Sequence, residues 1–404
     1  MKRNIWFAIA VSALGYFVDV YDLVLFNVVR VKSLQSFSLS PSEITSVGIY
    51  LLNIQLVGLL IGGLFWGTLG DKKGRVSVLF GSILLYSCAN IANAFVTDIT
   101  SYSICRFLAG IGLGGEFGIG VTLVSELLPK NKRGYGGMIV AATGALGAIT
   151  SGLIGDLFSW RTSYIVGGFM GFLLLGLRVS LSESEIFSRV KATSATIQRG
   201  SLKMLLGSPE LLSKYLQCIF IGTPIWITIG LFMALSPEIA QALNIAGPIS
   251  AGRSILFFNI GFGLGDILSS LLSQYLRSRR RAVLIHLLLT AFFSVVFLCL
   301  RSAEQMTFYS VCALLGIGAG YWAIFMMVTA EQFGTNLRAT VATSVPNLVR
   351  VLVVPCSLAL TTLKTHLGLI ESLALIQFVV ISCAMFSRRF LAETFSKDLN
   401  FVEK

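Results

Sequence analysis

The chain has 404 residues, of which 55% are hydrophobic and only 12% are Asp, Glu, Lys or Arg. A soluble domain carries about 25% charged residues, so the composition excludes an ordinary soluble enzyme or binding module. The net charge of +12 would suit nucleic acid, but the basic residues lie mainly in loops at one side of the apolar segments. We therefore expect attraction to anionic lipid and control of topology, and no nucleic-acid partner.

Twelve apolar segments are each long enough to cross about 30 Å of hydrocarbon as a helix. In chain order they are residues 5–29, 44–69, 76–96, 100–127, 134–157, 160–178, 211–236, 251–276, 281–301, 305–331, 339–361 and 368–392. The sequence therefore predicts an all-α membrane protein with twelve transmembrane helices.

The longest polar stretch between these segments divides them six and six. It predicts an N-terminal six-helix bundle (1–178), a linker (179–210) and a C-terminal six-helix bundle (211–404). The first segment contains Asp19 and Asp22 and has no A-x-A cleavage site. We expect it to be the first helix rather than a cleaved signal peptide.

The basic residues predict the orientation in the membrane. With both termini on one side, that side receives 23 of the 31 Lys and Arg and the other side receives five. Positive charge accumulates in cytoplasmic loops, so we expect both termini in the cytoplasm. The remaining three, Arg106, Arg253 and Arg350, fall inside the predicted spans.

The chain shows no pattern for catalysis, cofactor binding or disulfides. Its seven cysteines all lie in predicted spans without a C-x-x-C pair, and neither His286 nor His366 has a companion at metal-ligand spacing. Asp19 and Asp22 share one helix instead of facing each other as a catalytic pair would. A phosphate-binding loop is also lacking. We therefore expect that the protein is not an enzyme and binds no metal or cofactor. We expect an ion gradient as its energy source.

An internal repeat appears at a spacing of 205 residues. Glu126 corresponds to Glu331 and Arg133 to Arg338, each pair placing a carboxylate at a helix end and an Arg at the start of the next helix. At the same spacing Arg75 corresponds to Arg280. The repeat predicts two related halves, with substrate binding between them near the middle of the membrane.

Residues 67–76, GTLGDKKGRV, resemble the signature of the major facilitator superfamily between its second and third helices. The resemblance implies a secondary transporter with two pseudo-symmetric six-helix halves in a bacterial inner (plasma) membrane. It also implies a cytoplasmic gate, against the alternative of a charged turn that serves topology alone. We assign to this gate Gly67, Asp71, Arg75, Glu126, Arg133, Glu331 and Arg338.

Two further motifs refine the resemblance. Arg106 and the glycines after it resemble the fourth-helix motif R-x-x-x-G-x-G-x-G, and residues 16–26 resemble the D-G-[FY]-D segment of proton-coupled aromatic-acid and metabolite symporters, with Val20 in place of the glycine. The fifth segment has no G-P pair, which disfavours a drug exporter.

Charges inside the membrane are candidates for function because their burial is costly. At 1.5 Å per residue, Asp22 lies about 10 Å and Arg106 about 9 Å below the same membrane face, so the two can pair. Related sugar and metabolite symporters use such a pair for proton coupling. We assign Asp22, Arg106, Asp19 and Glu116 to proton coupling; the alternative is a structural pair that fixes helix packing.

Substrate-binding candidates gather in the second half. Arg350 lies near the middle of the membrane after Pro346, a position where we expect a kink, and its planar fork suits a carboxylate. The alternative partners of Arg350 are Asp266 or a backbone carbonyl, and Arg253 is expected at the outer rim. The full candidate set is Arg350, Tyr321, Trp322, Asn347 and Trp226.

The function expected from these features is proton-coupled uptake of a small organic anion by a monomeric transporter in the lipid bilayer. The alternatives are a proton-coupled sugar or polyol symporter and an exporter of a drug or siderophore. A sensor built on a transporter body would need a soluble signalling domain or a long tail.

Overall fold

The computed structural model describes residues 2–129, 133–179 and 199–403, and most of the predicted linker, 180–198, lies outside these residues. Twelve helical stretches of the described chain are long and apolar enough to cross a membrane, which confirms the predicted fold class. The helices are α1 (Lys2–Gln35), α2 (Pro41–Lys73), α3 (Arg75–Asn93), α4 (Ile99–Leu127), α5 (Arg133–Leu157), α6 (Trp160–Arg178), α8 (Leu202–Gly207), α9 (Pro209–Ile227), α10 (Ser236–Ala242), α11 (Ala251–Tyr275), α12 (Arg279–Leu298), α13 (Gln305–Ala319), α14 (Trp322–Gln332), α15 (Arg338–Val351), α16 (Val353–Leu367) and α17 (Leu369–Phe390).

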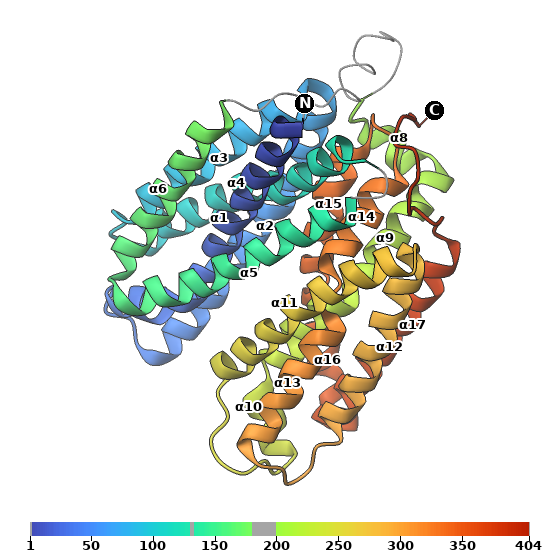
Figure 1. Cartoon of the computed structure of the whole chain (residues 1–404). Coiled ribbons are helices and arrows are strands. Elements are labelled where there is room, and N and C mark those ends of the chain that lie inside the picture. Colours follow the sequence, from blue (N-terminus) through green and yellow to red (C-terminus); the bar gives the residue numbers. More distant parts are fainter. Residues whose placement is uncertain (1, 130–132, 180–198, 404) are drawn as a thin grey trace. The chain divides into compact units, whose positions relative to one another are not determined.

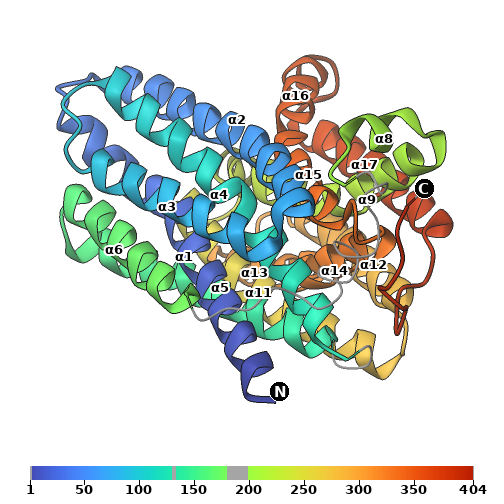
Figure 2. The same cartoon turned by 90° about the horizontal axis from the view of Figure 1, so that it is seen from above.

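Unit 1 contains α1 to α6 together with residues 333–347 and 398–404. Within it α2 packs on α4, α1 on α5, and α3 on both α4 and α6 (Figures 1 and 2). Small residues allow the closest of these approaches. A side-chain carbon at Gly114 of α4 would lie 2.5 Å from the backbone nitrogen of Gly63 in α2, so the contact requires glycine.

Unit 2 contains residues 206–332 and 348–397. Its strongest packing pairs are α11 with α13, α12 with α13, α9 with α17 and α12 with α17 (Figure 1). Phe232, Phe297 and Phe308 are fully buried in its main apolar cluster. A π-helical segment, Thr228–Met233, continues α9 four residues after Pro224. Pro224 removes a backbone donor from the helix, which accounts for irregular geometry nearby.

Two predicted spans are interrupted. The tenth, expected as one helix over 305–331, ends as α13 at Ala319 and resumes as α14 at Trp322. The carboxylate of Asp266 accepts a hydrogen bond from the Ala323 backbone N–H at 3.0 Å, which satisfies a donor that the interruption leaves unpaired. In the eleventh span Pro346 lies inside α15, and the interruption comes at Leu352 instead.

Candidate functional site

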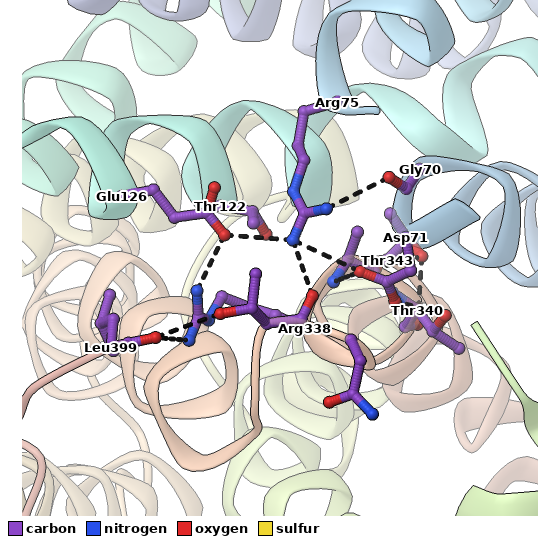
Figure 3. A network of polar contacts seen from close by, with 12 residues as sticks. Gly70, Asp71, Arg75, Thr122, Glu126, Arg338, Thr340, Thr343 and Leu399 are labelled. Atoms are coloured by element: carbon purple, nitrogen blue, oxygen red, sulfur yellow. Dashed lines mark hydrogen bonds and ion pairs between the residues drawn. The ribbon is translucent and has the colours of Figure 1, made fainter. Parts of the chain in front are cut away.

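The first group of predicted site residues forms a buried polar network in unit 1 (Figure 3). Asp71, near the end of α2, accepts hydrogen bonds from the backbone N–H groups of Ala339 and Thr340 at 3.0 and 2.8 Å, and from the Thr340 hydroxyl at 2.7 Å. A carboxylate at a helix N-terminus pairs with unsatisfied donors and with the helix dipole. Asp71 therefore holds the first turn of α15.

Arg75 and Glu126 connect this contact to α4. Arg75 lies 3.4 Å from Asp71 and 3.1 Å from Glu126, and it also donates to the Thr335 carbonyl at 2.9 Å. Glu126 in turn pairs with Arg338 at 2.8 Å. The side chains of all four charged residues are fully buried, so the network carries two guanidinium groups and two carboxylates with compensating charge.

Two glycines of the signature make this geometry possible. Gly74, the single residue between α2 and α3, has a φ of 119°, which side-chain-bearing residues rarely adopt. A side-chain carbon at Gly67 would lie 2.1 Å from the Thr343 hydroxyl and 2.8 Å from the Thr340 Cα. Gly67 thus lets α15 lie directly against α2.

The C-terminal segment completes the network. Arg338 donates to the Leu399 carbonyl at 2.9 Å, and the Thr335 backbone N–H donates to the Phe401 carbonyl at 2.8 Å. Asn336 exchanges hydrogen bonds with the backbone of Glu403. This role of the C-terminal segment was not predicted from the sequence, because backbone groups form most of its hydrogen bonds.

The remaining two gate candidates lie elsewhere. Arg133 begins α5 and is buried. Glu331 pairs in unit 2 with Arg279 at 3.4 Å. This pair is the counterpart of Arg75 with Glu126, so the repeat partner of Arg75 is Arg279 and the expected match with Arg280 is wrong. The repeat spacing changes by one residue in this loop.

The predicted Asp22–Arg106 pair lies between α1 and α4. Asp22 Oδ1 and Arg106 Nη2 are 3.8 Å apart, and both side chains are fully buried. The same Arg106 nitrogen donates to Asn90 of α3 at 2.7 Å, and the guanidinium stacks over the Tyr164 ring of α6 at 4.7 Å. Arg106 is therefore fixed by Asn90 and Tyr164 more closely than by Asp22.

The other two proton-coupling candidates have a different setting. Glu116 forms a two-pronged pair with Arg178, in which Arg178 Nη1 lies 2.9 Å from Oε2 and Nη2 contacts Oε1. Asp19 is 1% exposed in α1. Arg178, the last residue of α6, is completely buried.

In unit 2 the structure brings three of the predicted substrate residues together. The Arg350 guanidinium lies 5.1 Å from the Trp226 ring centre and 5.4 Å from that of Trp322. The two indoles are 6.0 Å apart at an angle of 69°. Cation–π contacts of this kind involve the flat face of the guanidinium, whereas its N–H groups point outward in the guanidinium plane.

The other second-half candidates differ in their surroundings. The Tyr321 hydroxyl donates to the Ile221 carbonyl at 2.9 Å. Asn347 belongs to unit 1, where its amide donates to the Gly114 and Thr343 carbonyls. Asp266 bonds the start of α14 as described above. Arg253, which we expected at the outer rim, is exposed in the first turn of α11.

Among the described residues no group of three or more His, Cys, Asp or Glu side chains is placed to hold a metal ion. Asn90, Arg178 and Arg279 are polar partners that sequence reasoning did not single out. The available signals were weak: Asn90 is one of several polar residues in an apolar helix, and Arg279 is one of four arginines within five residues.

Comparison with known proteins places the chain among transporters. The sequence profile of the Major Facilitator Superfamily matches residues 5–352. A Haemophilus influenzae protein named for metabolite transport is 34% identical over 52% of this chain, and the chain spans about half, 51%, of that relative. The benzoate transport protein of Acinetobacter baylyi is 25% identical over 83% of this chain and 78% of its own.

A solved structure of the proton:xylose symporter XylE bound to 6-bromo-6-deoxy-D-glucose has the same fold. It covers 99% of this chain and 98% of its own, with a TM-score of 0.76 and 17% identity.

Proposed function

The chain belongs to the Major Facilitator Superfamily, and from this premise we propose that it imports a small organic anion, most simply an aromatic carboxylate, together with protons. In this proposal the protein acts as a monomer in a cell inner membrane with both termini in the cytoplasm. The positive residues support this orientation, since they gather in the loops assigned to that side.

The observation that carries the proposal is the position of Arg350 against Trp226 and Trp322. The planar fork of a guanidinium matches the two oxygens of a carboxylate. The Trp226 indole nitrogen is buried and has no hydrogen-bond partner among the described residues. An aromatic carboxylate would meet a charge, an indole donor and ring faces at one place.

The Asp22–Arg106 pair supports proton coupling. At 3.8 Å the attraction is purely electrostatic, so neutralising Asp22 would cost no hydrogen bond between the two. Arg106 would keep Asn90 and Tyr164 as neighbours when Asp22 takes up a proton. The proton can therefore change the attraction between α1 and α4 without leaving Arg106 stranded.

The network around Asp71 supports alternating access. Residues 333–347 come late in the sequence but belong to unit 1, and hydrogen bonds to Asp71, Arg75 and Glu126 hold them there. We infer that this network is the cytoplasmic gate, formed in one state of the transport cycle and broken in another. Mutual compensation of its charges makes it a contact that can form and break as a unit.

A second candidate is uptake of a neutral sugar or polyol. It is favoured by the shared helix 1 carboxylate and helix 4 arginine of the sugar porters and by the likeness in fold to the xylose symporter. With a neutral substrate, Arg350 would contact protein groups such as the two tryptophans and would bind no substrate carboxylate.

A thermal-shift screen on the purified protein tests the proposal, since a ligand of the folded state raises the melting temperature by mass action. The panel contains benzoate with benzamide, nicotinate with nicotinamide, and xylose. We expect concentration-dependent stabilisation by at least one carboxylate and none by its matched amide. Equal shifts for acid and amide, or a shift with xylose alone, would overturn the organic-anion assignment.

A further inference from the structure

A lateral groove runs along unit 2 between α12 and α17, which lie side by side (Figure 1). It has a volume of about 460 Å³, and its apolar lining includes Ala291, Val295, Leu298, Phe378, Ile381 and Phe386. Phe378 is 70% exposed and Val295 is 61% exposed. Large exposed apolar side chains on spanning helices face hydrocarbon, so the groove opens toward lipid.

The groove is long enough for an acyl chain. Its lining on α17 extends from Ala374 to Arg389, which at 1.5 Å per residue is roughly 22 Å. One leaflet contributes about half of the roughly 30 Å of hydrocarbon in a bilayer. A lipid chain that enters from the end near Arg389 can therefore lie in the groove along its whole depth in that leaflet.

A cluster of arginines stands at this end. Arg389 lines the groove and lies in the last turn of α17, while Arg280 lies in the first turn of the antiparallel α12. Arg280 donates to the Arg389 carbonyl at 3.0 Å, and Arg388 donates to the Arg280 carbonyl at 3.3 Å. These hydrogen bonds hold the three arginines together where α12 begins and α17 ends, and a helix end lies at the level of lipid headgroups.

These arginines have no acidic counterpart in the described part of the chain. No carboxylate there forms an ion pair with Arg280, Arg388 or Arg389. The nearby Glu393 accepts instead from backbone N–H groups of Arg279 and Arg280 and from the Ser278 hydroxyl. Like charges gathered without compensation repel each other, and a bound anion would relieve that repulsion.

We propose that the α12–α17 groove is a binding site for an anionic phospholipid, with one acyl chain in the apolar groove and the phosphate at Arg388 and Arg389. Basic sites at the ends of membrane helices favour anionic headgroups. The groove supplies the apolar surface that binds the acyl chain of the same lipid. The site is independent of the transported substrate.

Native mass spectrometry of the delipidated full chain tests this proposal, with phosphatidylglycerol and phosphatidylcholine of matched acyl chains as probes. For the parent we expect at least tenfold tighter binding of phosphatidylglycerol. The double variant Arg388→Gln/Arg389→Gln should lose this preference. The control Arg253→Gln/Arg301→Gln removes the same number of charges, at the start of α11 and after the end of α12. This control should keep the preference for phosphatidylglycerol.

The variant Ser382→Trp fills the part of the groove that lies within one leaflet of Arg389, without changing charge, and it separates lipid binding from phosphate binding. We expect it to weaken phosphatidylglycerol binding at least fivefold. Inorganic phosphate should fail to compete at millimolar concentration. Equal binding of the two lipids by the parent, unchanged binding by Ser382→Trp, or competition by inorganic phosphate would each overturn the proposal. Circular dichroism confirms that each variant is folded.

Discussion

Besides the network around Asp71, two carboxylate–arginine pairs are buried in the described part of unit 1, and their geometries suit them to different roles. Glu116 and Arg178 meet through two hydrogen bonds, so removing one partner would strand a buried charge at a cost of about 3–5 kcal/mol. Asp22 and Arg106 lie 3.8 Å apart, and Arg106 has other partners. We therefore interpret Glu116 as a structural residue and Asp22 as the residue whose protonation is coupled to transport.

Changing Asp22 to Asn should abolish uphill accumulation while leaving exchange of labelled for unlabelled substrate largely intact. The amide mimics a permanently protonated carboxyl, so the loaded carrier can still change conformation but cannot couple it to the gradient. Uptake and exchange in proteoliposomes measure the two activities. Asp156→Asn, at an 81% exposed side chain, is the control, and normal accumulation by Asp22→Asn would assign coupling to another residue.

Changing Arg350 to Lys should weaken carboxylate binding by about 1–3 kcal/mol, roughly 5- to 150-fold in affinity. Lysine keeps the charge but loses the planar fork and its stacking on Trp226 and Trp322. Isothermal titration with the carboxylate found in the ligand screen gives the affinity. Arg253→Lys, at the exposed start of α11, should bind as the parent does; an unaffected Arg350→Lys would remove Arg350 from the site.

At the scale of helices, the close approach of helix backbones and the capping of helix ends determine where the polar network lies. Asp71 meets the first turn of α15 because the backbones of α2 and α15 come together at Gly67. In unit 2, Glu393 takes the equivalent place at the start of α12. The first turns of α15 and α12 thus each have backbone N–H donors paired with a carboxylate from another segment.

Gly67→Ala should destabilise the protein by about 1–3 kcal/mol, the usual cost of overpacking, and should reduce uptake. The added carbon would lie 2.8 Å from the Thr340 Cα, which is backbone that cannot move alone. Gly176→Ala is the matched control, because nothing lies within 4 Å of the added carbon there. Melting temperatures measured side by side distinguish them, and equal values would show that α2 and α15 do not meet at Gly67.

Glu393 predicts a pH dependence of stability. Burial tends to raise the pKa of Glu393, but hydrogen bonds from Ser278 and from backbone N–H groups outweigh it and hold that pKa below its ordinary value. A depressed pKa contributes stability that is present above the unfolded-state pKa and is lost as the pH falls through the folded-state value. Glu393 should therefore stabilise the protein at neutral pH.

Glu393→Gln should consequently lower the melting temperature at pH 7, and the difference from the parent should close only below about pH 4.3, the ordinary range of glutamate. Glu304→Gln is the control, since Glu304 precedes α13 without a side-chain capping bond. A difference that persists unchanged into strongly acidic buffer would show that the carboxylate charge is not responsible.

For the whole molecule, hydropathy was sufficient to predict the twelve spans, and depth along the helices was sufficient to bring Asp22 and Arg106 to one level. The break at Gly320 was not predictable, because the backbone donor that it leaves unpaired is satisfied by Asp266 from another helix. The pairing of Arg178 with Glu116 was not predictable for a related reason. At the end of an apolar segment, a loop arginine and a buried arginine look alike until the position of Glu116 is known.

In the proposed mechanism, a proton gradient drives uptake of an organic anion. The most direct measurement is accumulation of the carboxylate identified in the ligand screen, in proteoliposomes with an imposed pH gradient, acidic outside, and with sodium varied independently. We expect accumulation that follows the pH gradient, collapses with a protonophore and is unchanged by sodium. Accumulation that depends on sodium, or that persists after the protonophore, would contradict the proposed mechanism.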